Sequence, residues 1–278
     1  MKIITGSIPV QNASIFYKIY GEGRPILLMI TGGTGDADSY ENIIPFLIDA
    51  YTIVTYDRRG YSRSQISKIS KQEFIDIETQ SDDVNSLLRV ITKEPAYVFG
   101  SSIGAVIAID LAVRYPSLVK KVIAHEPPLV NQLPESERAG TVPEIQNNER
   151  PWETLRRFTA SFGLGQSNLA GQPIMVVSKE AKQRKAANAK FFLEHEAKGV
   201  DRYKLDMNKI KNVRSKIVFA AGKESMGNFL YGIAIKTAQD IGALFFGMSG
   251  HHMGYGQYPK EFSHELIEIL QCENIIQE

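Results

Sequence analysis

The chain has few of the features that would tie it to a membrane, a nucleic acid or an oxidising compartment. Its 278 residues include one cysteine, Cys272, which excludes an intramolecular disulfide and a cysteine-rich metal site. Its 32 Lys and Arg residues are balanced by 31 Asp and Glu residues, so nothing favours a polyanionic partner. No apolar run approaches the roughly 20 residues of a membrane span, and the N-terminus lacks the long apolar stretch of a secretory signal. We therefore expect a cytoplasmic protein that binds neither nucleic acid nor a membrane.

Cofactor and metal motifs are also missing. The chain has no Gly-x-Gly-x-x-Gly dinucleotide fingerprint and no phosphate-binding loop. His195-Glu196 lacks the second histidine of a His-Glu-x-x-His zinc site, and two prolines after His125-Glu126 exclude a helix there. We expect no metal and no cofactor.

Short apolar runs alternate with helix-like stretches along most of the chain, which predicts α/β architecture with a mostly parallel, doubly wound sheet. A hairpin of two antiparallel strands, turning at Asn12, precedes it. The apolar runs lie at 25–31, 51–56, 96–99, 119–124, 215–222 and 243–249.

Residues 129–211 differ from the rest, because they are polar, helix-patterned and without buried-strand runs. We predict a core made of residues 1–128 and 212–278, with 129–211 as a helical insertion. In doubly wound sheets the ligand crevice lies at the carboxyl ends of the strands, which is where this insertion begins.

The run 96–99 leads into Gly100-Ser101-Ser102-Ile103-Gly104, followed by a helical pattern. A serine on such a strand–turn–helix bend presents its hydroxyl above the sheet edge, beside the unpaired N–H groups of a helix N-terminus. Ser102 is therefore a candidate nucleophile. The alternative is a glycine-rich turn that only packs a helix onto a sheet.

A serine nucleophile needs a histidine base and a carboxylate that orients it. Of the five histidines, His251 and His252 alone follow directly after the last predicted strand. A base at either position would lie at the same sheet edge as Ser102.

Together these motifs resemble the α/β-hydrolase family, over about residues 8–128 and 212–272. The order of serine, acid and histidine is also the family's, and the segment 125–128, His-Glu-Pro-Pro, is similar to one after the sixth strand of some bacterial hydrolases. In that family a cap occupies the place of residues 129–211. The motifs that carry the resemblance are 31–33 (Thr-Gly-Gly), 57–64 (Asp-Arg-Arg-Gly-Tyr-Ser-Arg-Ser), 100–104 (Gly-Ser-Ser-Ile-Gly) and 250–252 (Gly-His-His).

The resemblance implies an oxyanion hole made by the backbone N–H groups of Ile103 and Gly33. Thr31 departs from it, because the family commonly has histidine there. The frame His252-Met253-Gly254-Tyr255 resembles the family's His-x-Gly-Tyr and favours His252 as the base, with His251 as the alternative.

Two positions are candidates for the carboxylate that orients the histidine. The family's usual position falls on Ser225, which carries no charge, and Glu224 stands one residue earlier. The alternative family position falls on Glu126, which Pro127 should hold in an extended conformation. We predict Glu126 as the acid, with Glu224 as the alternative.

The resulting hypothesis is a serine hydrolase that cleaves an ester or related small acyl compound through an acyl-enzyme. Other cofactor-free chemistry on the same scaffold (perhydrolysis, C–C hydrolysis or lyase activity) and a non-catalytic small-molecule binder are the alternatives. The sequence indicates no oligomeric state. We expect Arg58 and Arg59 to brace loops rather than touch substrate.

Five aromatic residues lie in or near the insertion. If they face the pocket rather than the core, the substrate is moderately apolar. These residues are Trp152, Phe158, Phe162, Phe191 and Phe192.

Overall fold

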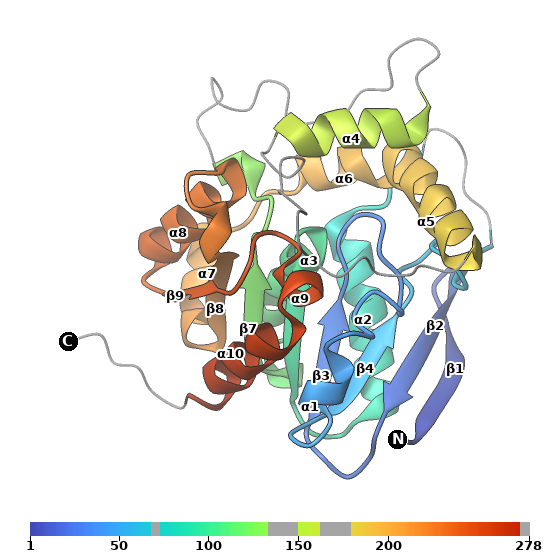
Figure 1. The fold of residues 1–278 in the computed structure, drawn as a ribbon, viewed down its shortest axis with the longest axis horizontal. Coiled ribbons are helices and arrows are strands. Elements are labelled where there is room, and N and C mark those ends of the chain that lie inside the picture. Colours follow the sequence, from blue (N-terminus) through green and yellow to red (C-terminus); the bar gives the residue numbers. More distant parts are fainter. Residues whose placement is uncertain (68–72, 133–149, 162–178, 273–278) are drawn as a thin grey trace.

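The computed structural model describes residues 1–67, 73–132, 150–161 and 179–272. They form a sheet in the strand order β1-β2-β4-β3-β6-β7-β8-β9, with β5 paired to β2 (Figure 1). Strands β1 and β2 form an antiparallel hairpin, β2 pairs antiparallel with β4, and all pairs from β4 to β9 are parallel. The predicted fold class is confirmed. The strands are β1 (Ile3–Val10), β2 (Ala13–Tyr20), β3 (Ile26–Ile30), β4 (Thr52–Tyr56), β5 (Gln65–Ile66), β6 (Ala96–Ser101), β7 (Val119–His125), β8 (Ile217–Gly222) and β9 (Leu244–Met248).

Helices cover both faces of the sheet, which explains why its central strands are apolar throughout. Alternate residues of β3 point to opposite faces, so Leu28 and Ile30 pack in one core cluster while Leu27 and Met29 pack in the other. The first cluster includes side chains of α2 (Ile77–Ile91), α3 (Ile103–Arg114) and α8 (Phe229–Ile241). The second includes side chains of α1 (Ile44–Leu47) and α10 (Pro259–Gln271).

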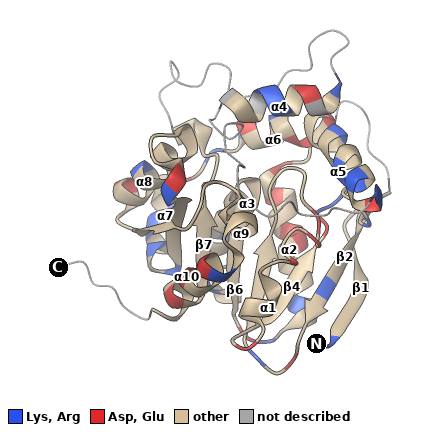
Figure 2. Cartoon of the chain, in the orientation of Figure 1, with Lys and Arg blue, Asp and Glu red and all other residues tan. Residues whose placement is uncertain are grey.

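Between β7 and β8 the described chain is helical and contains no strand. Figure 1 shows α4, α5 and α6 together above one end of the sheet, and Figure 2 shows basic residues along α5. One π-helical turn, Phe192–Glu196, joins α5 to α6. The helical elements of this segment are α4 (Pro151–Ser161), α5 (Lys179–Phe191), the π-helical turn, α6 (Ala197–Arg202) and α7 (Met207–Asn212).

The parallel strands all end at one edge of the sheet. The loops after β3, β4, β6, β7, β8 and β9 therefore meet there, as do the motifs from which the site was predicted. The helices α4 to α6 lie above this edge in Figure 1.

Candidate active site

Ser102 lies on a strained turn between β6 and α3. Its backbone has φ 57° and ψ −126°, a region that residues other than glycine rarely adopt. The turn requires small neighbours, because a Cβ on Gly100 would lie 2.2 Å from the carbonyl oxygen of Gly104, and a Cβ on Gly104 would lie 2.2 Å from that of Ile30. The Ser102 side chain is partly exposed, whereas Ser101 is buried. This geometry suits a presented nucleophile.

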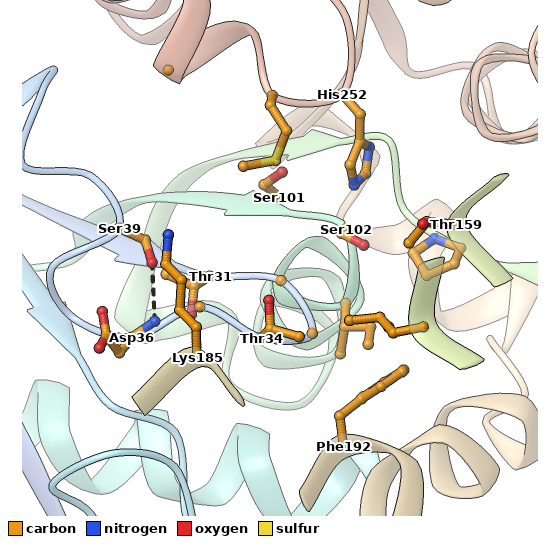
Figure 3. A pocket seen from close by; sticks show the side chains of 18 of the residues that line it. Thr31, Thr34, Asp36, Ser39, Ser101, Ser102, Thr159, Lys185, Phe192 and His252 are labelled. Carbon is orange, nitrogen blue, oxygen red and sulfur yellow. Dashed lines mark hydrogen bonds between the residues drawn. The ribbon is translucent and has the colours of Figure 1, made fainter. Parts of the chain in front are cut away.

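Ser102 opens onto a cavity of about 650 Å³. In Figure 3 the side chains of Ser102, His252 and Phe192 lie around the same space. One part of the wall is apolar and another is charged, and sequence patterns had indicated few of these positions. The apolar lining includes Val130, Leu155, Phe192, Val200, Leu230 and Met253. The charged lining includes Asp36, Asp38, Glu41, Arg184 and Lys185.

His252, in the loop between β9 and α9 (Gly254–Gln257), contacts Glu126, which directly follows β7. The distance from His252 Nδ1 to Glu126 Oε2 is 2.6 Å, and Gly222 N donates to Glu126 Oε1 at 3.0 Å. Glu126 is fully buried. Burial alone would raise the pKa of Glu126, but the hydrogen bond with His252 and the nearby imidazoles outweigh it and lower this pKa to about 2. The carboxylate therefore stays ionised and can orient His252.

The backbone of Glu126 differs from the prediction. The expected extended conformation was wrong, because Glu126 has φ 48°, in the left-handed region. Its amide donates to the carbonyl oxygen of Ala220 at 2.8 Å, so the chain stays bound to β8 while it turns. Pairing with β8 overrides the local preference that Pro127 imposes on its predecessor. The turn leaves the carboxylate between Gly222 and His252.

Glu224 and His251, the alternatives for the acid and the base, make other contacts. Glu224 is exposed, and its carboxylate raises the pKa of the neighbouring Tyr258. His251 Nδ1 accepts from the backbone N–H of Met253 at 3.1 Å, and His251 does not line the cavity. Ser225, at the family's usual acid position, is buried close enough to Glu126 to help lower the pKa of that carboxyl.

Ser102 and His252 line the same cavity but no direct hydrogen bond joins their side chains within the described residues. A serine nucleophile and its histidine base are expected to lie about 2.6–3.2 Å apart, or somewhat further apart without substrate. Such contacts are often longer without substrate and tighten only when it binds.

The predicted oxyanion donors lie beside Ser102. A Cβ on Gly32 would lie 3.0 Å from Ser102 Cβ, and one on Gly33 would lie 3.6 Å from Ile103 Cδ1. The amide groups of Gly33 and Ile103 donate no hydrogen bond to any other described residue. Both residues line the cavity, and neither amide is taken by another described residue.

Of the five aromatic residues named for the insertion, the structure describes the side chains of two, Phe191 and Phe192. Phe192 lines the cavity, whereas the Phe191 ring packs against Tyr61 with a centroid distance of 5.2 Å. The side chains of Trp152 and Phe158, and the whole of Phe162, lie outside the described residues. One of the five therefore faces the cavity in the described part.

Arg58 and Arg59 are both buried, and neither lines the cavity. Arg58 donates to the carbonyl oxygens of Gly32 and Gly33, and Arg59 pairs with Asp83. Both arginines therefore make structural contacts within the protein. The sequence analysis did not indicate Glu196, the buried ion-pair partner of Arg58, because Glu196 belongs to no motif.

Over the described ranges, no three His, Cys, Asp or Glu side chains gather where they could hold a metal ion. In the same ranges, none of the helices is both long enough and apolar enough to span a bilayer.

The buried His125 makes the free energy of unfolding depend on pH. Its imidazole is fully buried, and this burial lowers the pKa of His125 to about 4, although Glu126 acts in the opposite direction. An unfolded histidine takes up its proton near pH ~6.5. Between these values the unfolded chain binds more protons, so the free energy of unfolding falls as the pH falls.

We expect the His125→Gln variant to lose less stability than the wild type between pH 7.5 and pH 5. The difference should be on the order of 2 kcal/mol, measured by urea unfolding at both pH values. Glu126 does not contribute in this range, because its lowered pKa makes its own contribution disappear only below its ordinary pKa of about 4.5. Equal losses in the two proteins would contradict the prediction.

Comparison with known proteins places the chain in a family. The alpha/beta hydrolase fold family matches residues 25–172. Over 282 residues the chain is 37% identical to "Uncharacterized hydrolase YraK" of Bacillus subtilis (strain 168), with 98% of each chain covered. The chain belongs to the α/β-hydrolase family. It is thus a hydrolase of this fold, as its motifs indicated.

The chain is also similar, at lower identity, to two further proteins. The chain is 27% identical over 188 residues to "2-hydroxy-6-oxo-6-phenylhexa-2,4-dienoate hydrolase" of Comamonas testosteroni, covering 64% of this chain and 63% of the relative. A thermophilic esterase from Thermogutta terrifontis superimposes with a TM-score of 0.71 at 16% identity, covering 99% and 100% of the two chains. The second similarity is one of fold.

Proposed function

We propose that this α/β-hydrolase cleaves esters or related small acyl compounds through an acyl-enzyme on Ser102. The observation that carries the proposal is the 2.6 Å contact between His252 Nδ1 and the buried Glu126 Oε2, at the edge of the cavity that Ser102 also lines. Nucleophile, base and orienting acid then occupy the roles of a catalytic triad.

The reaction begins when the Ser102 hydroxyl attacks the substrate carbonyl and His252 Nε2 takes its proton. Glu126 accepts from His252 Nδ1–H, which leaves Nε2 as the acceptor and balances the charge of the imidazolium. The amides of Gly33 and Ile103 donate to the oxyanion. His252 then protonates the leaving group, and a water molecule, activated in the same way, hydrolyses the acyl-enzyme.

The substrate is proposed to be a small, moderately apolar molecule, since Val130, Leu155, Phe192 and Leu230 are among the cavity's lining residues. We propose that the predicted insertion, residues 129–211, acts as a cap that excludes water from this cavity. No cofactor takes part in the proposed reaction.

C–C bond hydrolysis is a second candidate. It is supported by the similarity to the Comamonas testosteroni enzyme, whose name describes a hydrolase of an oxo-phenyl-hexadienoate. In the charged part of the cavity Arg184 is paired with Asp36 and Asp38, so Lys185 is the cation proposed to accept a carboxylate group of such a compound. Parallel assays with a p-nitrophenyl ester and a 2-hydroxy-6-oxo-dienoate would separate the two reactions.

A fluorophosphonate probe tests the proposed nucleophile directly. We expect one phosphonyl group per chain, on the peptide that contains Ser102, and a stoichiometric burst of p-nitrophenol from a short-chain ester. Mass spectrometry and stopped-flow absorbance give the two readouts. Absence of labelling in folded protein would favour a non-catalytic binder and contradict the proposal.

A further inference from the structure

A buried ion pair links the helical segment between β7 and β8 to the loop beside Ser102. Arg58 follows β4, Glu196 ends the π-helical turn, and both side chains are 1% exposed. Arg58 Nη1 donates to Glu196 Oε1. Burial of such a pair has a desolvation cost, so the contact needs a reason beyond charge attraction.

The other amino group of Arg58 binds the loop that follows β3. Arg58 Nη2 donates to the carbonyl oxygens of Gly32 at 3.0 Å and of Gly33 at 3.2 Å. A trans peptide is planar, and its C=O and N–H groups point in opposite directions. When Arg58 holds the Gly32 oxygen on its own side, the N–H of Gly33 in the same peptide must point away from Arg58. That N–H is the proposed second oxyanion donor.

Glu196 in turn determines where the guanidinium lies. Gln80 Nε2 donates to Glu196 Oε1 at 2.8 Å, and Tyr61 Oη donates to Glu196 Oε2. Gln80 Oε1 accepts from Arg58 Nη1 at 2.9 Å, and the guanidinium carbon lies 4.2 Å from the centre of the Tyr61 ring. A carboxylate held at both oxygens gives Arg58 one well-defined position.

The same π-helical turn contacts the loop a second time. Phe192, at its start, lies against Gly33, where a Cβ would be 3.6 Å from the Phe192 ring. Single π-helical turns are frequent at functional sites. Here the turn places Phe192 close to Gly33 and reaches the same loop through Glu196 and Arg58.

We propose that Glu196 is a positioning residue for the oxyanion hole: through Arg58 it fixes the Gly32–Gly33 peptide, so oxyanion stabilisation depends on this helical segment being seated. The inference rests on the proposed function. It adds a control of Gly33 N–H by a residue that touches neither the nucleophile nor the base.

The test compares two buried arginine–carboxylate pairs, of which only Arg58–Glu196 contacts the loop 32–33. Glu196→Gln removes the negative charge that pairs with Arg58. Asp83→Asn is the matched control, because Asp83 is buried and pairs with Arg59 Nε at 2.6 Å, and neither Asp83 nor Arg59 contacts the loop 32–33. Both variants neutralise the carboxylate partner of a buried arginine next to the same strand.

We expect Glu196→Gln to lower kcat for a p-nitrophenyl ester roughly 10- to 100-fold while KM changes little. It should weaken the binding of a trifluoromethyl ketone, which forms an oxyanion with Ser102, by a similar factor. The binding of the matching methyl ketone should weaken much less. Asp83→Asn should lower the melting temperature to a similar extent but leave kcat and the inhibitor ratio near the wild-type values.

Tyr61→Phe provides a milder second variant should Glu196→Gln fold poorly. It removes the hydrogen bond to Glu196 Oε2 and should lower kcat and trifluoromethyl ketone affinity together by a few-fold. Equal kcat losses in Glu196→Gln and Asp83→Asn, or equal weakening of both ketones, would overturn the inference alone. Ester turnover that survives in Ser102→Ala would instead overturn the proposed function, and the inference with it.

Discussion

Replacing Ser102 with alanine is expected to lower kcat/KM for a short-chain p-nitrophenyl ester by on the order of 10⁴-fold or more. The Ser102 hydroxyl is the only group proposed to form a covalent bond with the substrate. Its removal leaves substrate binding and the oxyanion donors in place, but no acyl-enzyme can form. The fold should survive, because Ser102 is partly exposed and its structural hydrogen bond, from its backbone N to the carbonyl oxygen of His125 at 2.9 Å, remains. Steady-state kinetics and a melting curve measure both effects.

Ser101→Ala is the matched control. Ser101 precedes the nucleophile and also lines the cavity, but it is buried, and its hydroxyl lies 3.5 Å from His125 Nδ1. We expect kcat/KM within a few-fold of the wild-type value. If Ser101→Ala were as inactive as Ser102→Ala, or if Ser102→Ala kept a tenth of the activity, Ser102 would not be the nucleophile.

The second large effect is expected from Glu126→Gln, with a loss in kcat of roughly 10³- to 10⁴-fold. The carboxylate accepts from Gly222 N and contacts His252 Nδ1. A glutamine has one acceptor and one donor end. If its oxygen stays on Gly222 N–H, its NH₂ group faces His252 Nδ1, which must then lose its proton to Nε2. The ring is left in the tautomer that cannot accept the Ser102 proton.

Glu224→Gln tests the alternative acid. Glu224 is exposed and lies next to the buried Ser225. We expect kcat within about twofold of the wild-type value, because the charge of an exposed carboxylate is largely screened. The pH–rate profile should keep its shape in Glu224→Gln. A larger loss in Glu224→Gln than in Glu126→Gln would show that the acid lies after β8 and not after β7.

These predictions depend on different kinds of information. The alternation of apolar runs with helical patterns was enough to predict the parallel sheet, because burial on both faces imposes a local pattern on each strand. The turn at Ser102 was recognisable for a similar reason, because Gly100 is required by its approach to Gly104 and Ala105 within a single strand–turn–helix unit. Gly104 is required by its approach to Ile30 and Thr31 at the end of β3.

Partners across the fold were beyond any local pattern. Glu126 and His252 are 126 residues apart, and Arg58 and Glu196 are 138 apart. The resemblance to the α/β-hydrolases reduced the candidate acid to two residues, but only the tertiary structure shows that Glu126, with its amide bound to β8 and a φ of 48°, is the carboxylate that reaches His252.

The sequence by itself thus determined the fold class, the strained turn at Ser102 and the histidine loop, because each follows from residues within a few positions of one another. The tertiary structure alone decided which carboxylate contacts His252, which side chains line the cavity and what holds the Gly32–Gly33 peptide. Those contacts depend on how distant segments pack. No periodic pattern in the sequence identifies the partner of a buried polar group such as Glu196.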